Sequence, residues 1–173
     1  YAFGGAIYGN GSTITLSGNE SVTFSGNSAT CSMTGCGATG GAIDGSTITL
    51  SDNESVTFIG NSVYGTHNTR AHGGAIWGNT ITLNDNGNVT FSGNMACCSS
   101  RSYSYYHYAY GGALYGGVSI RNNGSVLFEK NAEVQSGIYC LRSIYAYGGI
   151  DLSAPKSGEI RFDDSIYTDG TLS

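Results

Sequence analysis

The sequence predicts an all-β solenoid of about five stacked coils, and two features lead to this prediction. After each of five glycine pairs come short β-branched or aromatic segments separated by Gly, Asn and Asp, without the 3.6-residue period of a helix. Units of this length cannot bury their apolar faces alone, so they are expected to stack into one domain, residues 1–173. Because Tyr1 lies inside a repeat, we expect the sequence to be a piece of a longer protein. The glycine pairs recur at intervals of 33 to 38 residues, beginning at Gly4, Gly40, Gly73, Gly111 and Gly148.

Each repeat is expected to begin with three strands. In the first repeat these are the segment around Ile7 and Tyr8, residues 12–16 and residues 21–24. Because side chains alternate along a strand, Ile14 and Leu16 point to one face and the threonines between them to the other. Stacked coils then place like residues in apolar columns. The predicted columns contain Ile7, Ile43, Ile76 and Leu114; Ile14, Leu16, Ile48, Leu50, Ile81, Leu83, Val118 and Ile120; and Val22, Phe24, Val56, Phe58, Val89, Phe91, Val126, Phe128, Ile160 and Phe162.

Asparagine marks the two turns that follow the second and third strands. Asn adopts left-handed backbone conformations readily, and stacked Asn side chains can pair along the axis, so we predict a structural role. Glycan attachment is the alternative, because several of these residues begin an N-x-S/T sequence. The turn residues are Asn19, Asn53, Asn86 and Asn123, then Asn27, Asn61, Asn94 and Asn131; the N-x-S/T sequences begin at Asn10, Asn19, Asn53, Asn88 and Asn123.

Four non-repeated segments, residues 28–39, 62–72, 95–110 and 132–147, are predicted to be long loops along one edge. Recognition is expected in them because the scaffold itself is repeated. The third and fourth are rich in Tyr and Ser, a composition typical of binding loops. Phe3, Tyr110 and Tyr147 precede glycine pairs at the same offset and are expected only to cover the flank. The predicted loop binding residues are Tyr103, Tyr105, Tyr106, His107, Tyr108 and Tyr139.

A second candidate is the outward position just after the glycine pair. It is occupied by Tyr8, Asp44, Trp77 and Tyr115 in the first four repeats. Trp77 is included among the predicted binding residues, because a flat aromatic column can stack on sugars or on partner side chains. The same column can instead pack beneath the loops.

The five cysteines, Cys31, Cys36, Cys97, Cys98 and Cys140, all lie in the non-repeated segments. A Gly-, Asn-, Ser- and Thr-rich repeat of secreted type favours disulfides. A bridge between Cys31 and Cys36 within one loop is one possibility. A link from Cys97 or Cys98 to Cys140 is another, and the odd number leaves one thiol over.

The repeat resembles the passenger domains of the polymorphic outer-membrane proteins, the autotransporter adhesins first described in chlamydiae. This resemblance rests on GGA[IL] and F-x-x-N recurring in register, at Gly4, Gly40, Gly73 and Gly111 and at Phe24, Phe58, Phe91 and Phe128. It implies a right-handed parallel β-helix, secretion and adhesion at the cell surface, as a fragment of a larger surface protein. The last copy departs from the pattern: Gly149 is followed by Ile150, and Ser165 stands three residues after Phe162.

Composition narrows the classes of function. A net charge of −5 is unfavourable for nucleic acid, and no apolar run approaches the ~20 residues of a membrane span. No cofactor is predicted, and the spacing of Cys97, Cys98 and His107 matches no structural zinc motif. We therefore predict an adhesion module that binds a surface protein or glycan of a host or neighbouring cell.

Three alternatives to adhesion remain. One is a carbohydrate-active β-helix enzyme, although the aspartates are scattered among turns and no catalytic residue is predicted. Another is a structural spacer. The third and most remote is an ice-binding array of threonines, formed by Thr13, Thr15, Thr47, Thr49, Thr80 and Thr82.

Overall fold

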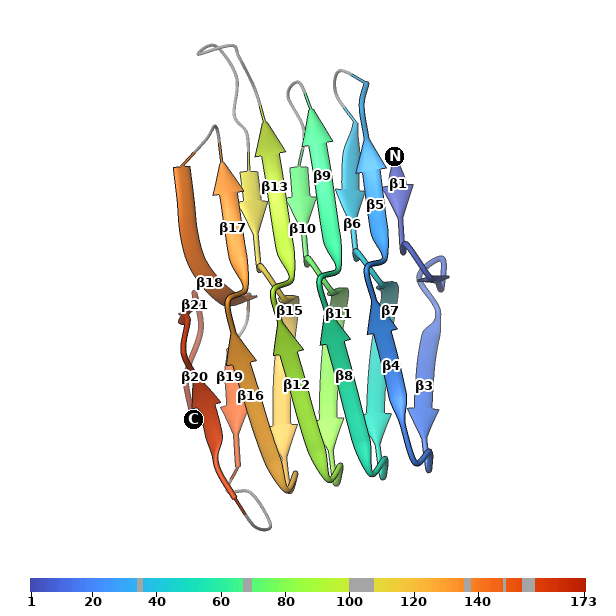
Figure 1. Ribbon diagram of the computed structural model, residues 1–173, viewed down its shortest axis with the longest axis vertical. Helices are drawn as coiled ribbons and strands as arrows, with labels where there is room; N and C mark the ends of the chain where they lie inside the picture. The colour runs from blue at the N-terminus through green and yellow to red at the C-terminus, as the bar shows by residue number, and fades with distance from the viewer. Residues whose placement is uncertain (34–35, 67–69, 100–107, 136–137, 148, 154–157) are drawn as a thin grey trace.

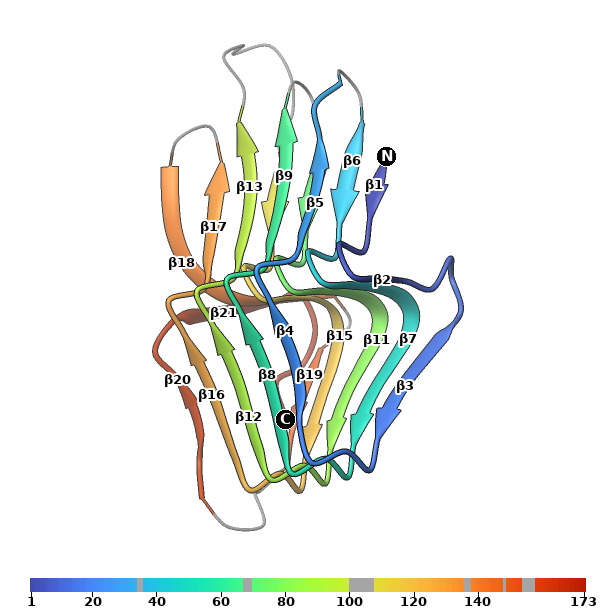
Figure 2. The ribbon, with the colours of Figure 1, turned by 45° about the vertical axis from the view of Figure 1, so that its right-hand side comes forward.

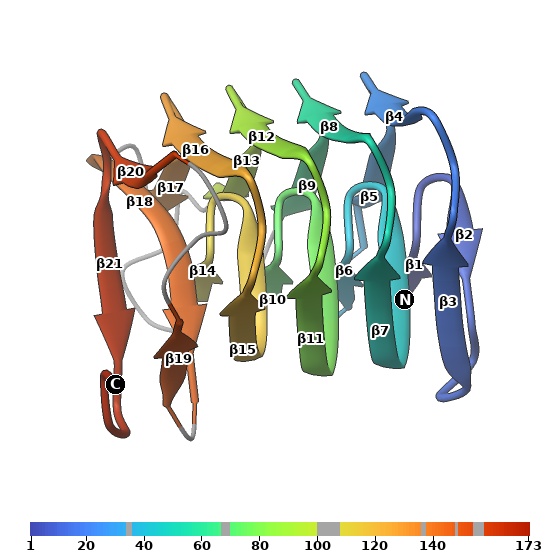
Figure 3. The same cartoon turned by 90° about the horizontal axis from the view of Figure 1, so that it is seen from below.

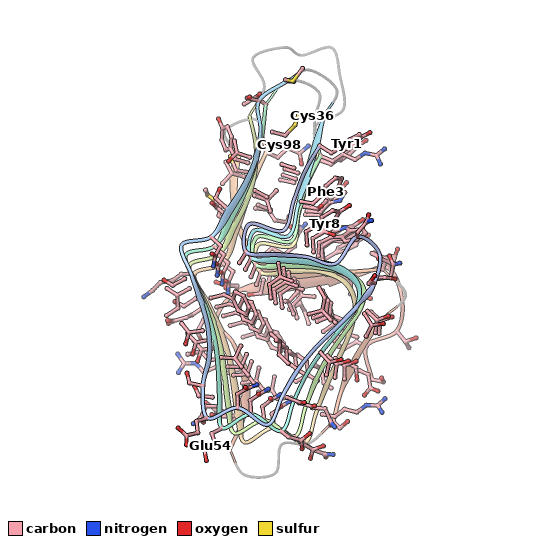
Figure 4. All side chains as sticks on the ribbon, turned by 90° about the vertical axis from the view of Figure 1, so that its right-hand side faces the viewer. Tyr1, Phe3, Tyr8, Cys36, Glu54 and Cys98 are labelled. Carbon is pink, nitrogen blue, oxygen red and sulfur yellow. A yellow bond between two sulfur atoms is a disulfide. The ribbon has the colours of Figure 1, made fainter. Side chains whose placement is uncertain are left out.

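The computed structural model describes residues 1–33, 36–66, 70–99, 108–135, 138–147, 149–153 and 158–173. Across these residues the chain forms β-strands and no helix, and hence no helix long and apolar enough to span a membrane. Figure 1 shows successive coils lying side by side from the N-terminus to the C-terminus. Viewed along the stack from the N-terminal end, each coil runs clockwise as the chain moves away from the viewer (Figure 4). The predicted right-handed parallel β-helix is confirmed.

The body of each coil is built from two sheets that face each other across the core (Figure 4). The first sheet has the spatial order β2 (Ile7–Tyr8), β7 (Ile43–Ser51), β11 (Ile76–Asn84), β15 (Leu114–Arg121) and β18 (Ile138–Ala146), with β3 (Thr13–Ser17) on β7, β19 (Ile150–Leu152) on β15 and β21 (Ser165–Thr168) on β18. The second sheet contains β4 (Val22–Ser25), β8 (Ser55–Ile59), β12 (Asn88–Ser92), β16 (Ser125–Glu129) and β20 (Ile160–Phe162).

Above the body stands an arm, which corrects one sequence expectation (Figure 2). The four segments predicted as loops are largely paired strands, because their small apolar residues alternate and stack in register as the body does. Only the middle of each segment lies outside the described residues. The outer arm strands are β5 (Ser28–Cys31), β9 (Ser62–Thr66), β13 (Met95–Ser99) and β17 (Ala132–Gln135); the inner ones are β1 (Ala2–Phe3), β6 (Gly37–Thr39), β10 (Arg70–His72) and β14 (Tyr108–Tyr110).

We number the coils from their inner arm strands, so that coil one is β1–β5, coil two β6–β9, coil three β10–β13, coil four β14–β17 and coil five β18–β21. The first two predicted body strands are separate only in coil one. In coils two to four they form one long bent strand. Gly45 and Gly78 pair with each other at the corner of coils two and three, whereas the register shifts at the corner of coil four. Coil five differs again: β18 runs antiparallel to β17 and then continues into the body, where it pairs in parallel with β15.

The predicted apolar columns form the core in the register expected. Phe24, Phe58, Phe91, Phe128 and Phe162 stack with ring centroids 4.8 to 5.0 Å apart. This is the spacing of neighbouring strands, so every ring packs on its own copy in the next coil. A second, smaller core of alanines, Val63 and cysteines fills the arm.

Each predicted asparagine column is a hydrogen-bonded ladder. The Oδ1 atom of Asn94, for example, accepts from the backbone N–H and the Nδ2 of Asn61, both at 3.0 Å. Asn53 and Asn123 are buried in the other ladder, which confirms their structural role. The left-handed residue is the one before each ladder asparagine, such as Asp52 or Asp85, rather than the asparagine itself.

In coil five the ladder position is taken by Asp164, not by the residue at the F-x-x-N spacing. The Oδ2 atom of Asp164 accepts from the backbone N–H of Asn131 at 2.9 Å and from the Ser143 hydroxyl at 2.8 Å. The chain is one residue shorter here, which accounts for the departure of the last copy from the F-x-x-N pattern.

The glycine pairs have steric causes. Gly40 has a φ of 59°, and a Cβ there would lie 2.2 Å from the carbonyl oxygen of Ile43. A Cβ on Gly41 would lie 1.9 Å from the carbonyl oxygen of Gly74 in the next coil. The same contacts recur at the other regular pairs, so side chains at either position would prevent the chain from entering the body of the coil.

Candidate functional site

Of the seven predicted binding residues, three lie among those that the structure describes, namely Tyr108, Tyr139 and Trp77. Tyr103, Tyr105, Tyr106 and His107 lie outside the described residues. Tyr139 lies in β18, on the part that pairs with β17. Tyr108 begins β14, and Trp77 lies near the start of β11.

Two columns of side chains meet where the inner arm sheet joins the body. One column runs through Phe3, Thr39, His72 and Tyr110, which are in register on β1, β6, β10 and β14. The other runs through Tyr8, Asp44, Trp77, Tyr115, Tyr145 and Tyr167. Figure 4 shows Phe3 and Tyr8 at this junction. Figure 3, seen from below, shows the strands of successive coils side by side. The predicted column is therefore present in register and extends into coil five, although Asp44 in it is buried rather than outward-facing.

The rings of the last three coils contact one another continuously, and we call this group the tyrosine cluster. Tyr110 and Tyr145 have centroids 4.2 Å apart, Tyr115 and Tyr145 5.5 Å, and Tyr145 and Tyr167 4.5 Å. Most members are half-buried, and Tyr167 is exposed. The cluster therefore both packs beneath the arm and presents ring edges to solvent. Its members are His72, Tyr108, Tyr110, Tyr115, Tyr145, Tyr147 and Tyr167.

Burial raises the pKa of four phenols of the cluster. It is the main cause that raises the pKa of Tyr145 to about 12, with Tyr110 adding to the effect. The pKa values of Tyr110, Tyr115 and Tyr147 are raised for the same first reason. These four phenols therefore stay protonated further above neutral pH than free tyrosine does, and their hydroxyls can donate as well as accept hydrogen bonds.

His72 is the buried member of the cluster. Its ring stacks on Tyr115 with centroids 4.3 Å apart, and its Nε2 atom has no hydrogen-bond partner. Burial, followed by the charge of Arg70, lowers the pKa of His72 to about 4. The imidazole is therefore neutral at physiological pH and acts as one more flat ring.

A polar pair separates this cluster from the rings of coil one. The Thr39 hydroxyl donates to Oδ2 of the buried Asp44. Burial raises the pKa of Asp44, and the bond from Thr39 opposes this effect. Beyond the pair, Phe3 stacks on Tyr8 with centroids 4.9 Å apart, so the aromatic surface has two separate parts.

Glu133 is a buried acid that the sequence reading missed. It stands in register with Ala96 on the inner face of the arm, where β18 has displaced the usual strand. Its Oε1 accepts from the Gly111 N–H at 2.6 Å, and its Oε2 from Arg142 Nη1 at 2.7 Å. Burial raises the pKa of Glu133 to about 7, against the lowering effects of these two donors. A charged residue in an apolar column was the available signal, but the column was hidden because the segment was interpreted as a loop.

The cysteines follow one of the two expected patterns. Cys31 and Cys36 form a disulfide across the arm, with Cα atoms 6.1 Å apart. Cys97 and Cys98 are buried thiols on β13. Strand β17 lies between β13 and the strand of Cys140, a separation of about 10 Å that is too long for a disulfide. The alternative link to Cys140 is therefore not formed.

The acidic side chains do not converge on one cleft. Asp151 pairs with Arg121, Asp163 with Arg161, and Glu133 with Arg142, each at a different place. Within the described part of the chain, no three His, Cys, Asp or Glu side chains gather into a group that could hold a metal ion.

One part of the chain matches a known family of protein repeats. Residues 88–117, which contain Phe91, Asn94 and the glycine pair at Gly111, match the Chlamydia polymorphic membrane protein repeat. The resemblance seen in the sequence is confirmed for this repeat. No curated protein and no solved structure matches the chain.

Proposed function

We propose that this chain is a surface-exposed adhesion module that binds a protein or glycan of a host or neighbouring cell. The match to a membrane-protein repeat supports a location at the cell surface, and the β-helix supports the role of a rigid presenting scaffold. The proposed contact residues are the tyrosine cluster together with Tyr103, Tyr105, Tyr106, His107, Tyr139 and Trp77.

One observation carries the proposal: in the tyrosine cluster, rings from two columns form one continuous group of contacts. The scaffold residues contact mainly their own copies in neighbouring coils, whereas the cluster joins rings from two different columns. Half-buried tyrosines are held rigidly by each other, so few side-chain rotations are lost on binding. Their hydroxyls and ring edges offer hydrogen bonds and apolar contact in the same small area.

The experiment measures retention of the labelled chain on epithelial cells and on an array of cell-surface proteins and glycans. One variant combines Tyr108→Ser with Tyr167→Ser, and a second combines Tyr103→Ser, Tyr105→Ser and Tyr106→Ser. Tyr64→Ser, on the outer arm sheet, is the matched control. We expect both combined variants to lose binding at an unchanged melting temperature while the control binds normally. Retained binding in both combined variants, or an equal loss in the control, would refute the proposal.

A further inference from the structure

A hollow on the outer face of the body lies where the threonine column stops. Thr47 and Thr80 are in register on neighbouring coils, and the next position along the column is Gly117. Because Gly117 has no side chain, an open space of about 280 Å³ remains between Thr80 and coil five. Ser119, Asp151, Thr171 and Ser173 also line this space.

Differences in coil length form the hollow. In coil four, two residues separate Tyr115 from Val118. In coil three, three residues separate their partners, Trp77 and Ile81. Coil five has four residues between its own partners, Tyr145 and Ile150. The short corner of coil four therefore lies next to the long corner of coil five, and the outer surface stays open between them.

The long corner carries Tyr147 to the edge of the hollow. Its carbonyl oxygen lies 3.8 Å from the position that a Cβ on Gly117 would take. Its hydroxyl oxygen lies 3.0 Å from Asn79 Oδ1 and 3.2 Å from the Gly78 carbonyl oxygen, which fixes the ring across the corner. Tyr147 also contacts Tyr115 at 5.3 Å between centroids, so the hollow adjoins the tyrosine cluster.

The lining combines hydroxyl groups with one oriented carboxylate. Thr80, Ser119, Thr171 and Ser173 supply side-chain hydroxyls. Both guanidinium contacts of Arg121 are made to Oδ2 of Asp151, one of them at 2.9 Å from Nε. The carboxylate is thus held in one orientation at the rim.

We propose that this hollow binds one neutral sugar ring of a glycan, an inference that rests on the adhesion function above and names its ligand class. The sugar's hydroxyls bond to Oδ1 of Asp151 and to the hydroxyls of Thr80 and Ser119, while one C–H face of the ring lies over Gly117, which has no side chain. The volume is slightly below the ~300 Å³ at which pockets for drug-sized ligands begin, which suits a single ring with the rest of the glycan outside.

The charges select a neutral ring. An anionic sugar would find no Lys or Arg among the described residues that line the hollow, because the guanidinium of Arg121 at the rim is already paired with Asp151, and the chain carries a net charge of −5. An apolar peptide side chain would cover the hydroxyls of Thr80, Ser119 and Thr171 and the Oδ1 atom of Asp151 without bonding to them, which is unfavourable. A neutral sugar satisfies these groups, because it carries donors and acceptors around its edge and C–H groups on its faces.

The test titrates the ¹⁵N-labelled chain with four probes: methyl β-D-galactopyranoside, methyl α-D-mannopyranoside, methyl β-D-glucopyranoside and the anionic N-acetylneuraminic acid. We expect at least one neutral glycoside to shift the amide signals of Gly117, Ser119 and Gly149 saturably at millimolar concentration. N-acetylneuraminic acid should shift none of them.

Three variants locate the site. Gly117→Thr restores the threonine column and fills the hollow, so the saturable shifts should disappear. Thr80→Val should weaken binding, whereas Thr47→Val, in the same column one coil away from the hollow, should not. Should Gly117→Thr fail to fold in a thermal melt, Asp151→Asn serves instead; loss of a hydrogen bond to a charged group predicts binding at least about tenfold weaker.

The outcomes separate this inference from the adhesion function. Cell binding that depends on the tyrosines, with no neutral glycoside shifting the hollow, overturns the sugar site and leaves the adhesion function intact. Glycoside binding at the hollow without retention on any cell, protein or glycan overturns the adhesion function instead. Binding that survives both Gly117→Thr and Asp151→Asn also overturns the sugar site.

Discussion

Replacing Glu133 by Gln should remove a pH-dependent loss of stability. Glu133 is almost fully buried, and its pKa rises from an ordinary 4.5 to about 7. A carboxyl whose pKa is higher in the folded state binds its proton more tightly there, so its stabilising contribution is complete below pH 4.5. It is lost as the pH rises to 7. The pKa difference corresponds to about 3 kcal/mol of unfolding free energy.

The assay is urea denaturation of wild type and Glu133→Gln from pH 4 to 8. The quantity of interest is the difference in unfolding free energy between the two proteins at each pH, which cancels every other titrating group. The amide cannot ionise, so this difference should move in favour of the variant by about 3 kcal/mol between pH 4.5 and 7. Arg142 is partly exposed, so water can solvate it when its charged partner is removed. A difference that stays constant with pH, or moves in favour of wild type, would refute the reasoning.

Two further predictions follow from buried polar groups. His72→Phe keeps the stacked ring and removes the titration. Because burial lowers the pKa of His72 from 6.5 to about 4, wild type should lose about 3 kcal/mol of unfolding free energy relative to the variant as the pH falls from 6.5 to 4. The same urea series measures this difference. Asn94→Ala removes four ladder hydrogen bonds and should cost on the order of 3 kcal/mol in unfolding free energy. Asn27→Ala, at the end of the same ladder, removes the one side-chain bond to Asn61 and should cost under about 1 kcal/mol. Equal costs of the two substitutions would show that the ladder contributes little.

The effects of Glu133 and His72 have opposite signs over nearly the same pH range. Raising the pH from 4.5 to 6.5 removes the stabilisation from Glu133 and restores that from His72. These two contributions therefore nearly cancel each other in wild type, so its stability profile alone would reveal neither of them. Each single variant exposes the slope of the remaining group, so the pair must be measured together.

The sequence predicts best those residues that contact their own copies. Phe91 stacks on Phe58 and Phe128, and Asn94 bonds to Asn61 and Asn131, so one repeat contains the full description of these contacts. The register of the body follows for the same reason. The arm was missed because its strands use small residues, such as Ala71 and Ala109, whose alternation is weak in a sequence rich in Gly and Ser.

The candidate site was only partly predictable, because it depends on contacts between unlike residues. The column through Trp77 and Tyr115 could be read from its fixed offset to the glycine pair. The contact of Tyr110 with Tyr145 could not, because it joins two columns whose separation is set by the fold of the arm. Asp164 and Glu133 were missed for a related reason: both replace a group that the irregular coil five no longer supplies.

Changes of length at a corner are how such a solenoid can acquire a concave site. A residue deleted within a strand would invert every side chain after it and place Val118 and Ile120 in solvent. At the corner between Tyr115 and Val118 the same deletion is absorbed by Gly116, with a φ of 148°, and the inward columns stay in register on both sides. The outer surface alone changes, and it changes where the next coil is longer. The apolar and asparagine ladders thus fix where length can vary, and the hollow at Gly117 lies at one of these permitted positions.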